Sequence, residues 1–221
     1  MDPTDNIPGL EEFLRSQPFI SIQPTQDSSL VLEGDFELNH AAEGYPAIAD
    51  TYRLRIAIPS AFPEQPPTIT ELAGRIPPLA DYHNGGGTLC LGSPLRLVAE
   101  LKKEPNLYAF SCRIIAPYFY AMSLKLNHGI HFAFGELRHG VDGELDDYRD
   151  LLGLENHEQI VSAFACLVKK KRIANKLRCP CGCKRQLGKC GYNATIRQLR
   201  KILPKNHIRK VVKSWMRNRR R

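Results

Sequence analysis

Apolar residues recur at every second position in two stretches near the N-terminus, residues 29–39 and 51–58. The apolar positions are Leu30, Leu32, Phe36 and Leu38 in the first stretch, and Tyr52, Leu54, Ile56 and Ile58 in the second. This alternation predicts two strands that each bury one face. Shorter candidates at 19–23 and 68–72 add a strand on either side, and the connections are too short to hold crossover helices. We therefore expect a four-stranded antiparallel meander that is open to water on one face.

Helical periodicity appears on both sides of this predicted sheet, so the expected fold class is α+β. A short helix at 10–16 precedes the strands. A longer helix is expected to begin after Asn106, whose side chain would cap it, and to kink at Pro117.

Further helices are predicted in the C-terminal half. Asn156 and Gln159 resemble a capping box for a helix that carries Ile160, Phe164 and Leu167, and a short helix is expected before it at 145–152. Pro204 separates two amphipathic, basic helices at the C-terminal end.

Bulk properties are those of a globular chain, of which 43% is hydrophobic. Residues 1–5 lack the basic and apolar regions of a secretory signal, and the longest uncharged apolar run, 114–124, is too short to span a bilayer. We therefore expect a cytoplasmic protein with no membrane partner. The seven cysteines, four of them packed between 179 and 190, favour thiol or metal chemistry over a disulfide framework.

Charge divides the chain into two parts. Residues 169–221 contain twenty Lys or Arg and no Asp or Glu, which leaves eleven of the 31 bases and all 23 acids to residues 1–168. The formal balance is therefore about −12 for the first part and about +20 for the second. We expect a domain at 1–168 and a basic module at 169–221, with the boundary in the basic stretch 169–176.

Cys90 lies in a glycine-rich stretch, 82–94, which follows the last predicted strand and a proline cluster at 62–67. His83 and Asn84 lie just upstream of the thiol. Acyl transfer through a thioester needs a soft nucleophile on a loop with polar groups nearby, and these residues supply that combination. Cys90 is thus the candidate nucleophile.

The order of helix, meander, proline-rich turn, cysteine loop and helices resembles the ubiquitin-conjugating enzyme family over roughly residues 8–125. The segment 62–67 is similar to the aromatic-Pro-x-x-Pro-Pro signature of that family, and 87–91 is similar to its Gly-x-aliphatic-Cys-Leu motif. His83 and Asn84 correspond to its His-Pro-Asn, although they lie seven and six residues before Cys90 rather than ten and eight, and the proline is absent.

The chain also lacks an Asp after Cys90-Leu91 and the downstream Trp of the eukaryotic members. In these departures it is more similar to bacterial ubiquitin-conjugating-like proteins, which are encoded beside an activating enzyme, a ubiquitin-like protein and a metallopeptidase in systems associated with antiphage defence. The resemblance implies that Cys90 receives a ubiquitin-like protein from an activating enzyme and passes it to an amine of a target protein.

Several residues are candidates for helping this transfer. His83 or Asp81 would accept the proton of the amine, and the tetrahedral oxyanion would be stabilised by Asn84 or by the backbone amides of residues 85–87. His83 and Asn84 would alternatively only hold the loop by hydrogen bonds. Cys112 and Cys166 are expected to be small core residues, and His139 a turn residue or a second contributor to the site.

Four thiols, those of Cys179, Cys181, Cys183 and Cys190, lie within twelve residues and predict a structural zinc site. Their spacing resembles the zinc motif at the C-terminus of the bacterial secretion motor, with Cys183 in place of Ser and Gly191 in place of the last ligand. The fourth ligand is therefore Cys183 or His207. Redox-active thiols are the alternative to zinc, and the transfer chemistry itself needs no cofactor.

The basic module has three candidate partners: nucleic acid, an acidic protein, and the acidic part of the same chain. Tyr192 and Trp215 lie among its bases. The leading hypothesis is a ubiquitin-conjugating-like transferase that uses this module for recruitment. Its rivals are a noncatalytic binding module of the same fold and a nucleic-acid-binding zinc protein.

Overall fold

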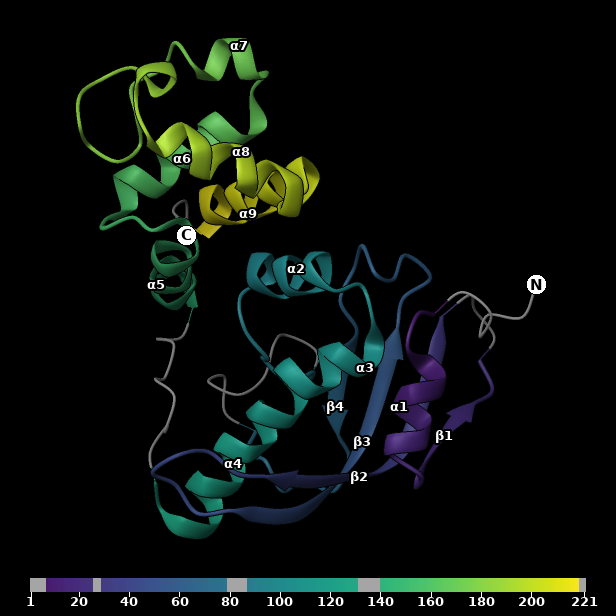
Figure 1. The fold of residues 1–221 in the computed structure, drawn as a ribbon. Helices are drawn as coiled ribbons and strands as arrows, with labels where there is room; N and C mark the ends of the chain where they lie inside the picture. The colour runs from purple at the N-terminus through teal and green to yellow at the C-terminus, as the bar shows by residue number, and fades with distance from the viewer. Residues whose placement is uncertain (1–6, 26–28, 79–86, 131–139, 219–221) are drawn as a thin grey trace. The chain divides into compact units, whose positions relative to one another are not determined.

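The structure is a computed structural model that describes residues 7–25, 29–78, 87–130 and 140–218 (Figure 1). Side chains are described in these ranges except at 140–142 and 214–218. The chain forms two compact units, Met1–Leu91 with Glu100–Glu136 and Gly92–Ala99 with Leu137–Arg221. We call the first the sheet unit and the second the helical unit. No helix in the described part of the chain is both long and apolar enough to cross a membrane.

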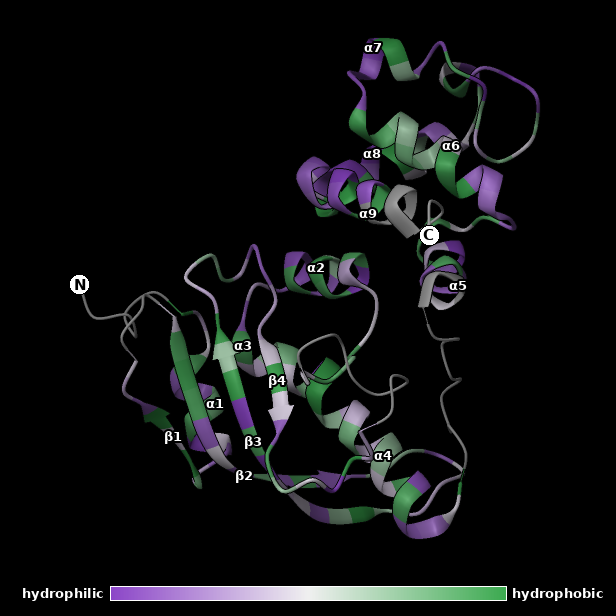
Figure 2. Cartoon of the chain, turned by 180° about the vertical axis from the view of Figure 1, so that it is seen from behind, coloured by the Kyte–Doolittle hydropathy of each residue, from purple (hydrophilic) through white to green (hydrophobic). Residues whose placement is uncertain are grey.

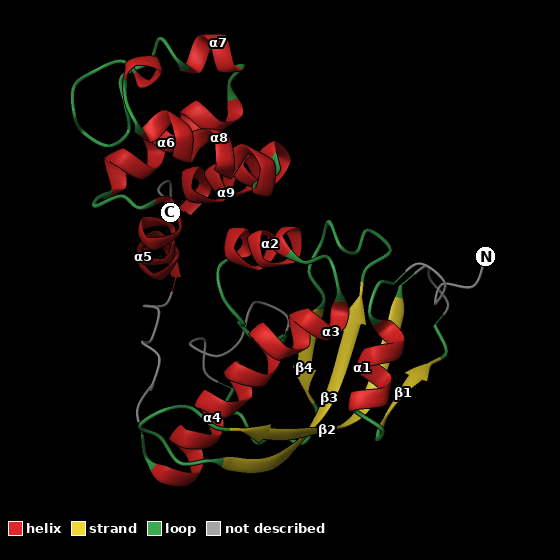
Figure 3. Cartoon of the chain, in the orientation of Figure 1, coloured by secondary structure: helices red, strands yellow, loops and turns green. Residues whose placement is uncertain are grey.

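The sheet unit contains the predicted meander (Figure 3). Helix α1 (Leu10–Ser16) precedes four strands: β1 (Ile20–Gln23), β2 (Leu30–His40), β3 (Ile48–Ile58) and β4 (Thr68–Glu71). Each strand pairs antiparallel with the one before it. The predicted α+β class and the four-stranded antiparallel sheet are therefore confirmed, although β3 begins three residues earlier than expected.

One face of the sheet is buried and the other is exposed, as the alternation requires. The predicted inward positions of β2 and β3 are all buried: Leu30, Leu32, Phe36, Leu38, Tyr52, Leu54, Ile56 and Ile58. Phe119 of α4 (Ala116–His128) packs on this face, with its ring centre 4.4 Å from that of Tyr52 and 5.9 Å from that of Phe36. On the outer face, Glu33 lies opposite Arg55 and pairs with it at 3.0 Å.

The helix expected after Asn106 is present but is not uniform. Asn106 caps α3 (Leu107–Phe110) by accepting a hydrogen bond from the Ala109 N–H at 2.9 Å. A π-helical turn, η1 (Ser111–Ile115), then leads into α4. Pro117 has no N–H to donate to the preceding turn, and the Ala116 N–H instead bonds the Ser111 carbonyl five residues back. The disturbance that Pro117 predicts thus takes the form of a π turn.

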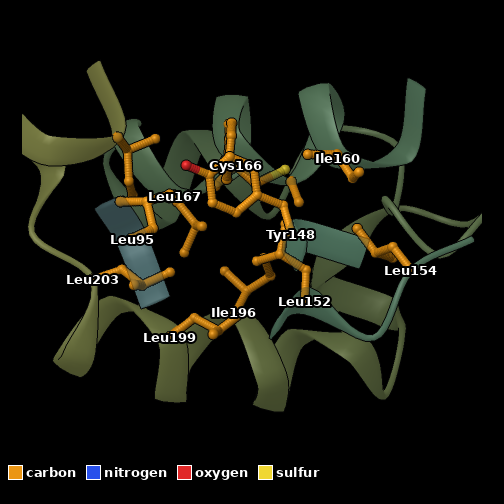
Figure 4. Packing of buried hydrophobic residues seen from close by; sticks show 14 of the residues in the cluster. Leu95, Tyr148, Leu152, Leu154, Ile160, Cys166, Leu167, Ile196, Leu199 and Leu203 are labelled. Carbon is orange, nitrogen blue, oxygen red and sulfur yellow. The ribbon is translucent and has the colours of Figure 1, made fainter. Parts of the chain in front are cut away.

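The helical unit is built from α5 (Gly140–Leu152), α6 (His157–Val168), α7 (Lys171–Ala174), the short η2 (Leu187–Lys189), α8 (Tyr192–Ile202) and α9 (Lys205–Asn218). Asn156 caps α6 as predicted, accepting from the Gln159 N–H at 3.0 Å. The apolar faces of α5, α6, α8 and α9 form one core (Figure 4), whose larger members include Tyr148, Leu152, Phe164, Leu167, Ile196, Leu199, Leu203 and Ile208.

Helix α2 (Pro94–Lys103) was not predicted from the sequence. Ser93 stands at its N-terminus and accepts a hydrogen bond from the Arg96 N–H at 3.3 Å. The same hydroxyl bonds the carboxylate of Asp147 in α5, which is buried and also pairs with the Arg96 guanidinium. Leu95 in the first turn of α2 belongs to the core of the helical unit (Figure 4).

The compact units do not coincide with the two parts that the charge pattern separates. Residues 137–168 precede the charge boundary at 169, yet the structure groups them with the basic C-terminal residues. The physical reason is the apolar face of α6, which packs against α8 and α9 in one core regardless of surface charge. By this division the helical unit holds 23 of the 31 bases and seven of the 23 acids, a balance of about +16 against about −8 for the sheet unit.

Asp50 is the centre of a polar cluster in the sheet unit. Its carboxylate binds the guanidinium of Arg75 through two bonds, at 2.9 and 3.0 Å, and accepts from the Ser123 hydroxyl at 2.8 Å. Burial alone would raise the pKa of Asp50, but the hydrogen bonds from Arg75, Ser123 and the Thr51 N–H outweigh it and lower the pKa to about 2. The cluster ties the chain after β4 to β3 and α4.

Replacing Asp50 with Asn should lower the free energy of unfolding at neutral pH by about 1–2 kcal/mol, because the Arg75 guanidinium loses a charged acceptor. An Asp whose pKa is lowered from 3.8 to about 2 stabilises the fold above pH 4, and this stabilisation is lost as the pH falls from about 4 to 2. Urea unfolding followed by circular dichroism should therefore show a shallower acid dependence in Asp50→Asn. The exposed Asp35→Asn is the matched control, and an equal loss in both variants would contradict this role.

Candidate functional site

The four cysteines of the C-terminal segment meet in space. The sulfur atoms of Cys179, Cys181, Cys183 and Cys190 all lie within 4.8 Å of one another. The Cys179 sulfur is 3.2 Å from that of Cys181, and the Cys190 sulfur is 3.6 Å from those of both Cys181 and Cys183. The sequence prediction that these residues form one cluster is confirmed.

Backbone pairing brings the first three thiols to the fourth. Arg178 and Gln186 form an antiparallel bridge, and the Cys179 N–H donates to the Arg185 carbonyl at 2.8 Å. The chain reverses between them through Gly182, whose φ is 79°, a conformation that favours glycine. The single turn η2 then ends at Lys189, and the N–H of the next residue, Cys190, donates to the Leu187 carbonyl at 3.1 Å. This short hairpin folds the Cys-x-Cys-x-Cys segment over Cys190.

The donor set fits a tetrahedral zinc ion. A zinc–sulfur bond of about 2.3 Å places neighbouring sulfur atoms of a tetrahedron about 3.8 Å apart, close to the separations found here. The group contains Cys183 and does not contain His207, which lies in the described part of α9. The structure therefore favours Cys183 over His207 as the fourth ligand.

The four sulfurs can all be thiolates at the same time only if a cation offsets their negative charge. Hydrogen bonds from the backbone N–H and the side chain of Arg185 lower the pKa of Cys183 to about 6, whereas burial raises the pKa of Cys179 and of Cys181. A bound zinc ion would hold all four as thiolates by offsetting their negative charge. Four protein ligands leave no open position for a substrate, so the ion would be structural.

The cluster is continuous with the core of the helical unit. Leu187 and Cys179 belong to that core, and Cys181, Cys183 and Cys190 pack against it. The Tyr192 hydroxyl, two residues after Cys190, donates to the Leu152 carbonyl at the end of α5 at 2.6 Å. A metal bound here would therefore join the hairpin to the helices around it.

Cys90 lies in the sheet unit, directly beyond its edge strand. Leu89 is buried, and its N–H donates to the carbonyl of Ile69 in β4 at 2.7 Å. Cys90 itself is half-buried, and Gly87, three residues before it, has a φ of 81°. The seven cysteines, all within the described ranges, form no disulfide. The thiol is thus fixed at one side by the sheet and belongs to an irregular segment.

The predicted helpers of Cys90 lie outside the described residues. These are Asp81, His83, Asn84, Gly85 and Gly86, and the same holds for His139. Their roles remain predictions.

The two remaining cysteines differ from each other. Cys166 is buried in the core of the helical unit, as expected, but Cys112 is exposed, so the prediction that it is a core residue is wrong. The π turn places Ser111 and Ile115, rather than Cys112, against the core.

The clusters around Asp50 and Asp147 were not predicted from the sequence. The side-chain partners of Asp50 lie 25 to 77 residues away from it and those of Asp147 lie 51 or 54 residues away, so no local motif contains either cluster. Only the Ser93-Pro94 pair, which is typical of a helix start, indicates the beginning of α2, where Ser93 contacts Asp147.

Purified protein should contain one zinc ion per chain, measured by elemental analysis. Cys183→Ser should weaken zinc binding by at least about 100-fold in competition with a chelator, because loss of a group that only hydrogen-bonds to a metal ligand already weakens binding about 10–100-fold. His207→Ala and Cys112→Ser are the controls and should bind zinc normally. Zinc-free protein, or a loss in His207→Ala with none in Cys183→Ser, would contradict the assignment.

Comparison with known proteins leaves the chain without a relative to argue from. No family model matches it, and neither a curated protein nor a solved structure gives a significant match. The function is therefore inferred from the chemistry of Cys90 and of the cysteine cluster.

Proposed function

We propose that the chain is a ubiquitin-conjugating-like transferase, which carries the C-terminal acyl group of a ubiquitin-like protein as a thioester on Cys90. The observation that carries the proposal is the position of this thiol. Leu89 is hydrogen-bonded to the edge strand β4, and the next residue is a half-buried cysteine in an irregular segment. An acyl-carrying thiol needs such a place, because it must be held firmly and still be reached by two macromolecules.

The arrangement of the sheet unit supports the proposal. Its elements follow the order that the resemblance implies: a helix, a four-stranded antiparallel meander, a proline-rich turn, the cysteine segment and a helix across the sheet. The proline-rich turn is held by Phe62, which is buried, and by Glu64, which pairs with Lys102 at 2.5 Å. The turn and Cys90 both belong to the sheet unit.

The reaction would proceed in two exchanges at the acyl carbon. In the first, the Cys90 thiolate attacks the thioester on the activating enzyme, a new carbon–sulfur bond forms, and the thiolate of that enzyme leaves. In the second, the nitrogen of a neutral amine attacks the acyl carbon. The carbon–sulfur bond to Cys90 breaks, the amine loses a proton, and an amide forms. The first exchange is nearly balanced in free energy and the second is downhill.

The second exchange needs a proton acceptor and an oxyanion donor. A lysine amine with a pKa near 10.4 is almost wholly protonated at neutral pH, so a base such as His83 or Asp81 would take its proton. An oxyanion donor is worth about 3 kcal/mol in the transition state. Asn84 and the backbone amides of residues 85–87 are the candidates, and the positive φ of Gly87 supports the backbone alternative.

The helical unit would serve recruitment rather than chemistry. Its cluster is suited to a structural zinc ion, and the acyl transfer needs no metal. By its resemblance to bacterial proteins, the proposed pathway would be one of antiphage defence, with an activating enzyme, a ubiquitin-like protein and a target protein as partners.

Mixing the chain with an activating enzyme, a ubiquitin-like protein and ATP should give an adduct in intact-mass measurement that thiol reagents remove. Cys90→Ala should abolish the adduct, and Cys90→Ser should convert it to an ester that resists thiol reagents, because oxygen replaces sulfur in the acyl bond. Cys112→Ala is the matched control, since Cys112 is an exposed cysteine of the same unit, and it should leave the adduct unchanged.

Two outcomes would contradict the proposal. An adduct that survives Cys90→Ala would place the nucleophile elsewhere. Stable, noncovalent binding of the ubiquitin-like protein without any adduct would instead identify a noncatalytic binding module.

A further inference from the structure

The bases of the helical unit between residues 169 and 213 are nearly all exposed, and the salt bridges of the described residues do not neutralise them. Sixteen Lys or Arg lie between 169 and 213, and all except Arg200 are exposed. Arg200 is half-buried and donates to the Cys166 carbonyl at 2.6 Å. Among the described residues, none of the salt bridges found includes a base from this segment. The positive charge therefore faces solvent.

On α8 and α9, exposed bases form a row along the side of each helix that faces solvent. Their apolar sides are buried in the core through Ile196, Leu199, Leu203, Ile208 and Val211. Their exposed sides carry bases four residues apart, at Arg197 and Lys201 of α8 and at Lys205, Arg209 and Lys213 of α9. Figure 2 shows hydrophilic residues along both helices, with hydrophobic residues between them. We call these five bases the basic stripes.

Like charges at this spacing destabilise a helix. Four residues span one helical turn of about 6 Å, so each base of a stripe stands beside the next. The helices persist because their apolar sides pack into the core. A row of counter-charges would remove the repulsion, and a polymer with regularly spaced negative charges supplies such a row.

The composition of this surface distinguishes between an acidic protein and nucleic acid as the anionic partner. Protein interfaces have an apolar, aromatic-rich centre and are depleted in Lys, whereas nucleic-acid interfaces are polar and strongly positive. Between residues 169 and 213, Ile173 is the one large hydrophobic side chain that is exposed. This part of the helical unit thus has the composition of a phosphate-binding surface rather than that of a protein-binding one.

The surface is also hollowed beside the first stripe. A depression of about 430 Å³ is lined by Lys171, Asn175, Asn193 and Arg197, together with Ala194 and the segment that contains Cys190. The Asn193 amide donates to the Asn175 side chain at 3.1 Å and to the Leu187 carbonyl at 3.2 Å, so these amides are held in place. Lys171 and Arg197 are both exposed, and two bases that line one depression suit a phosphate group of a longer chain.

We propose that the basic stripes of α8 and α9 bind the phosphate backbone of nucleic acid without sequence specificity. The inference is independent of the thioester chemistry assigned to Cys90. Binding arises from neutralised phosphates and released counterions, so it weakens steeply with salt.

The test is fluorescence anisotropy with the full zinc-loaded chain and labelled duplexes of random sequence at 50–200 mM salt (about the range in which phosphate contacts are resolved). The neutral variant combines R197Q, K201Q, K205Q, R209Q and K213Q. Its affinity should fall at least about tenfold. The slope of log K against log salt should become shallower by about 0.9 for each phosphate contact that is lost.

Two matched controls accompany the neutral variant. The first keeps the charge by combining R197K, K201R, K205R, R209K and K213R, and it should bind as the unaltered chain does. The second removes three exposed bases of the sheet unit by combining R15Q, R53Q and K103Q, and it should also bind normally. Circular dichroism and zinc content verify that each variant is folded.

Duplex DNA and duplex RNA are measured in parallel, and the duplex that binds with the higher affinity identifies the backbone that the surface prefers. Polyglutamate of equal charge is the competitor that represents an acidic protein. Absence of binding to both duplexes, equal binding by the neutral variant, or displacement by polyglutamate as effective as by nucleic acid would overturn the proposal. Because Cys90→Ala should bind both duplexes normally, failure of the transferase proposal remains distinguishable from failure of this one.

Discussion

Four sulfur atoms within 4.8 Å of one another are the constraint on which the helical unit depends. Thiolates at this distance repel one another, and thiols would leave buried sulfur without a strong partner, so a cation resolves both problems. The hairpin that holds three of the sulfurs is short: its arms share one antiparallel bridge and the bonds from the Cys179 and Leu187 N–H groups to the carbonyls of Arg185 and Leu177. The metal and the packing of Leu187 would therefore fix the hairpin, and with it the start of α8, against the core.

The two proposals place different chemistry in the two units. The sheet unit has an acidic balance and presents Cys90 beyond its edge strand, whereas the helical unit has a basic balance and a surface suited to phosphate. A transferase built in this way would use the helical unit to select where it acts and the sheet unit to act. The metal would contribute by keeping α8 in position, and so would affect partner binding without entering the acyl transfer.

Local patterns predicted most of the fold. The period-two alternation of Leu30 to Leu38 identified the strands, and Asn106 and Asn156 identified helix starts, because each signal lies within a few residues. The cysteine spacing predicted that the four thiols meet, for the same reason. The sequence did not reveal what depends on distant partners: α2 with its Ser93–Asp147 contact, the Asp50 cluster, the exposure of Cys112, and the packing of residues 137–168 with the basic segment.

Zinc K-edge X-ray absorption on the purified chain tests the central claim most directly, because it reports the ligand atoms of the bound ion without altering any residue. The account predicts four sulfur neighbours at about 2.3 Å and no nitrogen or oxygen ligand. A spectrum that requires an imidazole nitrogen or a bound water in place of one sulfur would contradict the four-thiolate site, and with it the structural role given to the metal.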